Sequence, residues 1–153
     1  MLAFVELAPD RPTPPDRTAR PGAGVEDPTA AARPILVVDD DPEILAMLRD
    51  FLESEGLSVR TASNGAEALE TLDDVAPALI LLDMRMPVLD GWAFAERFHE
   101  RALTYPIVVM TAAESARRRA EEIGATGYIA KPFDVNELLE IIERHRQKDS
   151  KPN

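Results

Sequence analysis

The sequence predicts an α/β protein with one parallel β-sheet that helices cover on both faces. From Pro34 onward, short apolar runs alternate five times with amphipathic segments of helical periodicity. The short runs are almost continuous in Val, Ile and Leu, which is typical of strands that are buried on both sides. The chain has 153 residues, 45% of them hydrophobic, and this is enough for one core. One folded domain is therefore expected.

The apolar runs predict five strands. Each is short and is bounded by turn residues or charges, which favours a strand over a buried helix. The expected strands are residues 35–39, 57–62, 78–82, 107–110 and 127–130.

The segments between these runs predict five helices. The first has Asp41 as its N-cap and Pro42 at its first position, and Gly56 ends it. The expected apolar face of this helix consists of Ile44, Met47, Leu48, Phe51 and Leu52.

Three further helices are expected at 66–73, 91–101 and 114–123. The turn Asn64-Gly65 precedes the second helix, Asp90 begins the third and Gly124 ends the fourth. The last helix opens with Asp134 and Glu137, which have the spacing of a capping box.

The ends of the chain differ in composition from the middle. Residues 1–33 carry proline at positions 9, 12, 14, 15, 21 and 28 and have little apolar periodicity. Such a segment buries too little apolar surface to offset the entropy of ordering it, so a disordered arm is expected. The domain is expected to span 34–147, and a short polar tail, 148–153, follows it.

Composition excludes several classes of function. With 28 acidic and 17 basic residues, the net charge of −11 disfavours binding to nucleic acid and to anionic membranes. The absence of cysteine excludes disulfides and thiolate-bound zinc. The sequence contains neither a signal peptide nor an apolar run of membrane-spanning length, so a cytoplasmic protein is expected.

Polar side chains follow four of the predicted strands. They are Asp39 and Asp40, then Asp83, then Thr111, and finally Lys131. The carboxyl ends of parallel strands lie at one edge of a sheet, where α/β proteins bind their ligands. These side chains are therefore expected to share one site.

Clustered carboxylates need a cation, because two like charges ~4 Å apart repel by ~4 kcal/mol at a surface-like dielectric constant. A site with oxygen ligands alone favours Mg²⁺ over Ca²⁺ and fits zinc poorly. A carboxylate beside Mg²⁺ can attack phosphorus, and Lys131 and Thr111 are suited to neutralising the charge of a phosphoryl group. The residues therefore indicate phosphoryl-transfer chemistry.

Four ordered motifs resemble a known family. Residues 35–146 resemble the receiver domain of bacterial two-component response regulators through the motifs ILVVDDD, LLDMRMPVLDG, VVMTA and GYIAKPF. The resemblance implies a flavodoxin-like (βα)5 fold, a doubly wound sheet with the strand order 2-1-3-4-5. It also implies a cis peptide bond before Pro132.

The resemblance also implies a role for each polar residue. Asp83 is expected to be the phosphoacceptor and Lys131 the lysine that pairs with the phosphoryl group. Asp40 is expected to bind Mg²⁺ directly, with Asp39 acting largely through water. The remaining expected roles are the backbone carbonyl of Arg85 as a metal ligand, the Thr111 hydroxyl as a switch group and Tyr128 as the switch aromatic.

The implied function is that of a stand-alone receiver, since the chain ends soon after the last helix. Its expected partners are a sensor histidine kinase or a histidine phosphotransfer protein, and a downstream protein target that reads helix four, strand five and helix five. A phosphorylation-dependent homodimer is a further expected partner state. The family acts on its own aspartate, so turnover of an external substrate is not expected.

Two alternatives stay open at this point. One is a phosphatase or phosphotransferase with an aspartyl-phosphate intermediate, and the other is a receiver-like interaction module that is not phosphorylated. The acceptor follows the third strand instead of the first, which disfavours a phosphatase of the haloacid dehalogenase type. The presence of Asp83, Thr111 and Lys131 together disfavours the unphosphorylated module.

Overall fold

The computed structural model describes residues 33–150, with side chains up to residue 146, and it has the predicted α/β architecture. The proposed arm, 1–33, lies outside the described residues except for Arg33, and so do the last three residues of the proposed tail. None of the helices in the described part of the chain combines the length and the apolar character that a membrane span requires.

The sheet contains five strands in the order β2-β1-β3-β4-β5, and every neighbouring pair is parallel. The expected order 2-1-3-4-5 is therefore confirmed. The strands are β1 (Ile35–Val38), β2 (Val59–Ala62), β3 (Leu79–Asp83), β4 (Ile107–Ala112) and β5 (Gly127–Lys131).

Several strands end at other residues than expected. Strands β3, β4 and β5 continue past their apolar runs, through Asp83, Ala112 and Lys131, because backbone pairing carries on after the side chains become polar. Strand β1 ends one residue earlier than expected and β2 begins two residues later. The apolar pattern therefore missed the polar strand ends, which are the part of the sheet that carries the site.

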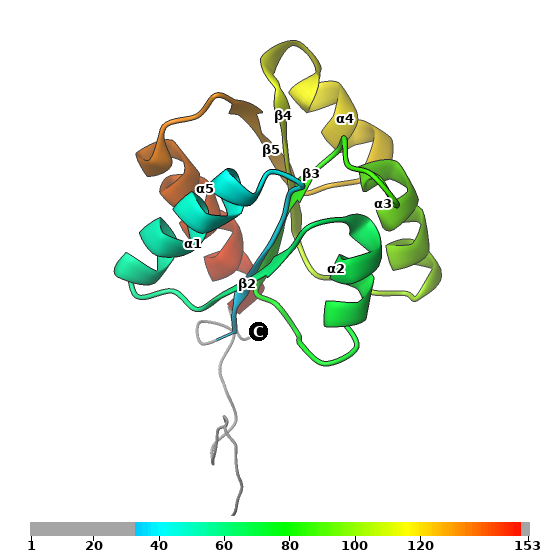
Figure 1. Ribbon diagram of the computed structural model, residues 1–153, viewed down its shortest axis with the longest axis horizontal. Helices are drawn as coiled ribbons and strands as arrows, with labels where there is room; N and C mark the ends of the chain where they lie inside the picture. Colours follow the sequence, from blue (N-terminus) through cyan, green and yellow to red (C-terminus); the bar gives the residue numbers. More distant parts are fainter. Residues whose placement is uncertain (1–32, 151–153) are drawn as a thin grey trace, which may run out of the picture.

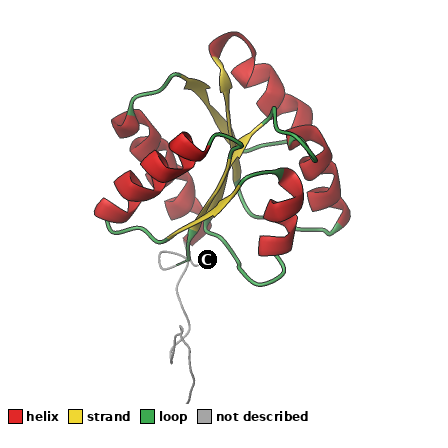
Figure 2. Cartoon of the chain, viewed as in Figure 1, coloured by secondary structure: helices red, strands yellow, loops and turns green. Residues whose placement is uncertain are grey.

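The helices form a layer on each side of the sheet (Figures 1 and 2). Helices α1 and α5 cover one face, and α2, α3 and α4 cover the other. The helices are α1 (Pro42–Ser54), α2 (Gly65–Thr71), α3 (Gly91–Glu100), α4 (Ala116–Ile123) and α5 (Val135–Ser150), and a 3-10 turn, η2 (Ala113–Ser115), precedes α4. Helix α5 extends into the segment that was expected to be a polar tail.

Two apolar clusters form the core, one on each face of the sheet. Alternate residues of β1 and β3 point to opposite faces, so Leu36 and Ile80 pack under α2, α3 and α4, while Val37 and Leu81 pack under α1 and α5. All eight apolar residues of these two strands are fully buried. These two interior strands therefore form a buried base for the groups at their carboxyl ends.

The expected apolar face of α1 is wrong at one position. Leu48 and Leu52 are fully buried, but Met47 is 44% exposed. Leu45 packs against the core in its place. Since Met47 lies about 100° around the helix from Leu48, it falls outside the stripe that faces the sheet.

The loop after β3 contains an unfavourable backbone conformation. Val88 has φ 70° and is 81% exposed, and the Leu89 N–H donates to the Pro87 carbonyl at 2.7 Å, which makes a γ-turn. A β-branched residue in this region is strained by about 1–2 kcal/mol, because its Cβ crowds the backbone.

Val88→Gly is therefore expected to raise the free energy of unfolding by about 1 kcal/mol, after allowing for the greater freedom of glycine in the unfolded chain. Urea denaturation measures the change. The control is Val88→Ala, which keeps a Cβ and is expected to change stability by less than about 0.5 kcal/mol. A less stable Val88→Gly protein would contradict the strain argument.

Candidate functional site

Three carboxylates meet at the carboxyl edge of the sheet. Asp83 is the last residue of β3, and Asp39 follows β1, the strand that pairs with β3. Asp39, Asp40 and Asp83 each place one carboxylate oxygen within 4.8 Å of the others. The predicted convergence of these acids is therefore present, and it follows from the adjacency of β1 and β3.

Lys131 binds two of these acids. Its Nζ lies 2.8 Å from Asp39 Oδ2 and 3.6 Å from Asp83 Oδ1. Lys131 is the last residue of β5, which is separated from β3 by β4, so its long side chain crosses the end of β4 to reach them. The peptide bond that follows, Lys131-Pro132, is cis as expected.

Thr111 completes the set of polar strand ends. The register pairs Asp83 with Met110, so Thr111 comes one residue further along the neighbouring strand. Its side chain is buried, and it lines a pocket of about 410 Å³ together with Asp83 and Lys131. A group attached to Asp83 in this pocket would lie beside the Thr111 hydroxyl and the Lys131 ammonium.

The surroundings of Asp83 make it a weaker acid than usual. Burial, followed by the charge of Asp39, raises the pKa of Asp83 to about 6, although Lys131 and a hydrogen bond from the Arg85 backbone N–H act in the opposite direction. At pH 7 the carboxylate is still mostly ionised. Its neighbours therefore stabilise the charged form of Asp83 less than water would.

The pKa of Lys131 is shifted in the direction that keeps it charged. Burial alone would lower this pKa, but the hydrogen bond to Asp39 and the charges of Asp83 and Asp39 raise it overall. The ammonium is therefore charged at neutral pH and supplies a positive charge to the site.

The two aspartates before α1 have different surroundings. Asp39 is 1% exposed, and its Oδ1 accepts the Asp41 N–H at 2.9 Å, while Asp40 is exposed to solvent. Asp41 itself accepts the Glu43 N–H at 2.9 Å, so it caps α1 as predicted. Asp40 therefore has an open side toward solvent, whereas Asp39 is already held by the protein.

Of the remaining two predicted site residues, Arg85 borders the pocket and Tyr128 lies further out. Tyr128 is 44% exposed on β5, away from the carboxyl edge, because it lies three residues before the end of that strand. Arg85 is exposed in the loop after β3. The role of the Arg85 carbonyl as a metal ligand stays a prediction, and so does the role of Tyr128 as a switch.

The 3-10 turn η2 and the start of α4 also contribute to the pocket, and sequence analysis did not expect this. Glu114, Ser115, Arg118 and Arg119 line it together with Asp83. Three consecutive arginines, 117–119, are typical of a solvated helix face. Their pattern in the sequence therefore did not indicate that two of them line the pocket. Helical side chains point toward the N-terminus of their helix, and the N-terminus of α4 lies beside the site. This direction could have indicated that the arginines reach the pocket.

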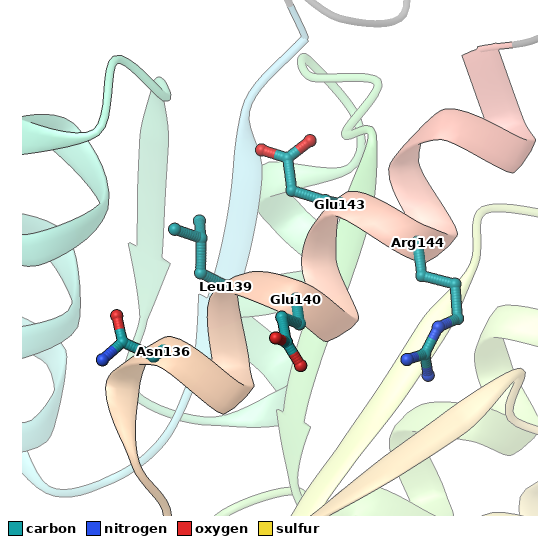
Figure 3. A pocket seen from close by; sticks show the side chains of 5 residues that line it. All are labelled: Asn136, Leu139, Glu140, Glu143 and Arg144. Atoms are coloured by element: carbon teal, nitrogen blue, oxygen red, sulfur yellow. The ribbon is translucent and has the colours of Figure 1, made fainter.

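A second pocket, of about 600 Å³, lies along α5 (Figure 3). Its labelled side chains all project from that one helix, and they are Asn136, Leu139, Glu140, Glu143 and Arg144. It contains none of the residues at the strand ends. The polar groups at the strand ends therefore line the pocket at the carboxyl edge and not this one.

The donors at the carboxyl edge suit a hard divalent cation. The cluster of acids offers carboxylate oxygens only, and the chain contains no cysteine. The cluster supplies only a few protein oxygens, and one of its acids, Asp40, is exposed to solvent. Coordination positions therefore remain for water and for a phosphate, which is the arrangement that Mg²⁺ adopts. Mg²⁺ therefore fits this donor set.

Comparison with known proteins agrees with this geometry. The family model described as the response regulator receiver domain matches residues 35–143. The chain is 38% identical over 123 residues to the DNA-binding transcriptional regulator NtrC of Escherichia coli K12, a match that covers 77% of this chain and 26% of that regulator. The chain thus spans about a quarter of the length of that relative.

Two further matches cover nearly all of the other protein. An uncharacterized 14.6 kDa protein of Leptolyngbya boryana is 38% identical over 121 residues, which cover 76% of this chain and 92% of that one. The crystal structure of the receiver domain of NtrX from Brucella abortus superposes with a TM-score of 0.68 at 33% identity, and covers 74% of this chain and 98% of that domain.

Proposed function

The chain belongs to the family of response regulator receiver domains, and from that premise we propose that Asp83 accepts a phosphoryl group from a phosphohistidine. The observation that carries the proposal is the placement of Asp83 within 3.6 Å of Lys131 Nζ and beside Asp39 and Asp40. The family is a regulatory phosphoacceptor module and not a class of enzyme that turns over external substrates.

The transfer needs only one new bond to the protein. An ionised Asp83 oxygen attacks phosphorus, the P–N bond of the donor breaks, and its electron pair leaves with the imidazole, which takes up a proton. The product is an acyl phosphate on Asp83. In this proposal, Lys131 supplies positive charge to the transferred group, and the Thr111 hydroxyl donates a hydrogen bond to one of its oxygens.

Asp40, Asp83 and the Arg85 carbonyl are the proposed direct ligands of Mg²⁺, with Asp39 held close by. A bound Mg²⁺ supplies positive charge that offsets the repulsion between the acids and the phosphate. Asp39 is suited to the outer role, because both of its oxygens already accept hydrogen bonds, from the Asp41 N–H and from Lys131.

The proposed readout is a change of the α4, β5 and α5 surface. The Thr111 side chain lines the site, and Thr111 belongs to β4. Strand β4 pairs with β5, which contains Tyr128. Movement of Thr111 toward a phosphoryl group would favour an inward Tyr128 ring, which is 44% exposed here. The proposed partners are a sensor histidine kinase or histidine phosphotransfer protein, in the cytoplasm, and a downstream protein.

Incubation with acetyl phosphate and Mg²⁺, followed by intact mass spectrometry, tests the proposal. The wild-type protein is expected to gain the mass of one phosphoryl group, and excess EDTA is expected to prevent this. Asp83→Asn is expected to gain none, while Asp73→Asn, an exposed acid that pairs with Arg101, is the matched control and is expected to behave as wild type. An adduct that persists in Asp83→Asn would refute the assignment, and sustained release of phosphate over many turnovers would favour the phosphatase alternative.

A further inference from the structure

The pocket beside Asp83 has a cationic wall that belongs to α4. Arg118 and Arg119 both line it, opposite in charge to the acceptor. They lie in a chain with a net charge of −11, so positive charge is scarce and its position is informative. The two arginines differ in what already holds them.

Arg119 is fixed by its neighbours. Its guanidinium lies 5.0 Å from the centre of the Trp92 ring, and its Nη1 lies 3.3 Å from both carboxylate oxygens of Glu122. Glu122 also accepts the Trp92 Nε1–H at 2.8 Å. Arg119 therefore ties α4 to the start of α3 and has little freedom to contact a new anion.

Arg118 is held far less. Among the described residues, its one ion pair is a 3.8 Å separation between Nε and Glu122 Oε2, which is too long for a hydrogen bond, and its side chain is 67% exposed. Glu122 is already occupied by Trp92 and Arg119. The Arg118 guanidinium is thus available, at low cost, to an anion that enters the pocket.

Resting on the proposed function, we infer that Arg118 is a positioning residue for the phosphoryl group, which it contacts from the α4 side of the pocket. Lys131 is paired with Asp39 at the end of β5. It therefore faces the phosphoryl group from the strand ends, and Arg118 faces it from α4. An arginine fork donates two N–H groups to phosphate oxygens, and the same contact attracts an anionic donor before transfer. Arg118 therefore increases the rate at which small acyl phosphates react with Asp83.

The test compares Arg118→Ala with Arg117→Ala in the full chain. Arg117 is the residue before it on the same helix, is 77% exposed, pairs with Glu121 at 3.2 Å and does not line the pocket. Both changes remove one positive charge. The second-order rate constant for phosphorylation by acetyl phosphate with Mg²⁺, followed by intact mass, is expected to fall about fivefold in Arg118→Ala and less than twofold in Arg117→Ala.

Two more readouts separate positioning from a structural role. Raising the KCl concentration is expected to slow phosphorylation of the wild type more than that of Arg118→Ala. Salt screens the attraction between Arg118 and the anionic donor, and the variant lacks this attraction. Arg118→Lys is expected to recover about half of the lost rate. If Arg118→Ala does not fold, Arg118→Gln carries the same expectation.

The outcomes also separate this inference from the proposed function. A wild-type protein that gains no phosphoryl group would refute the proposed function itself. A wild-type adduct, together with equal rates in Arg118→Ala and Arg117→Ala, would overturn the role of Arg118 and leave the assignment of Asp83 in place.

Discussion

Replacement of Lys131 by methionine is expected to lower the free energy of unfolding by about 2 kcal/mol at pH 8 in EDTA, and to slow phosphorylation by roughly ten- to a hundredfold. The ammonium lies 2.8 Å from Asp39 Oδ2, and Asp39 is 1% exposed. Without it, a buried carboxylate loses its positive partner while a second, Asp83, stays beside it. Methionine keeps the apolar stem, so the loss reports on the charge.

Urea denaturation and the acetyl phosphate assay measure the two effects. The matched control is Arg117→Met, which removes an exposed charge and is expected to cost less than about 0.5 kcal/mol. Millimolar Mg²⁺ is expected to restore part of the stability of Lys131→Met, because a cation again faces the acids. If the free energy of unfolding in EDTA is the same for Lys131→Met and wild type, Lys131 does not offset a repulsion between the acids.

Asp83→Asn is expected to make the metal-free protein more stable at neutral pH, by about 1.5 kcal/mol, while abolishing phosphorylation. Burial and Asp39 raise the pKa of Asp83 to about 6, from 3.8. A shift of this size corresponds to about 3 kcal/mol, which we halve because the site is open to water on one side. Asparagine has a similar shape and carries no charge, so it removes this penalty.

The sign follows from proton linkage. Between pH 3.8 and about 6 the folded state keeps the Asp83 proton and the unfolded state releases it. Stability contributed by this group therefore falls as pH rises through that window, and the loss is complete above about pH 6. The stability difference between Asp83→Asn and wild type should thus grow from pH 4 to pH 7.

Unfolding curves at several pH values in EDTA measure this difference. Asp73→Asn, which changes an exposed acid outside the site, serves as the matched control for the loss of one carboxylate. Added Mg²⁺ is expected to stabilise the wild type more than Asp83→Asn, because one proposed ligand is lost. A difference that is constant with pH would contradict the raised pKa of Asp83.

Much of the fold followed from local patterns. Apolar runs of four to six residues predicted all five strands, and capping residues such as Asp41, Asp90 and Gly124 predicted helix boundaries to within one or two residues. These signals are local because a cap or a buried strand depends on a few neighbouring residues. The errors occurred where tertiary context decides, as at Met47 and at the polar ends of β3, β4 and β5.

The polar groups of the candidate site were also accessible from sequence, since Asp83, Thr111 and Lys131 each follow a predicted strand. Whether they meet was not, because that depends on which strands are neighbours. The order β2-β1-β3-β4-β5 came from the resemblance to a family, since no spacing in the chain encodes which strand lies beside which.

By itself, the sequence determined where strands and helices form and which reactive groups stand at strand ends, since both depend on short-range periodicity and capping. The tertiary structure alone decided the distances among Asp39, Asp83 and Lys131, the raised pKa of Asp83, and the approach of Arg118 and Arg119 to the pocket. Burial and electrostatic interaction are properties of groups that are distant in the chain and close in space. They become defined only when the sheet has brought its strand ends together.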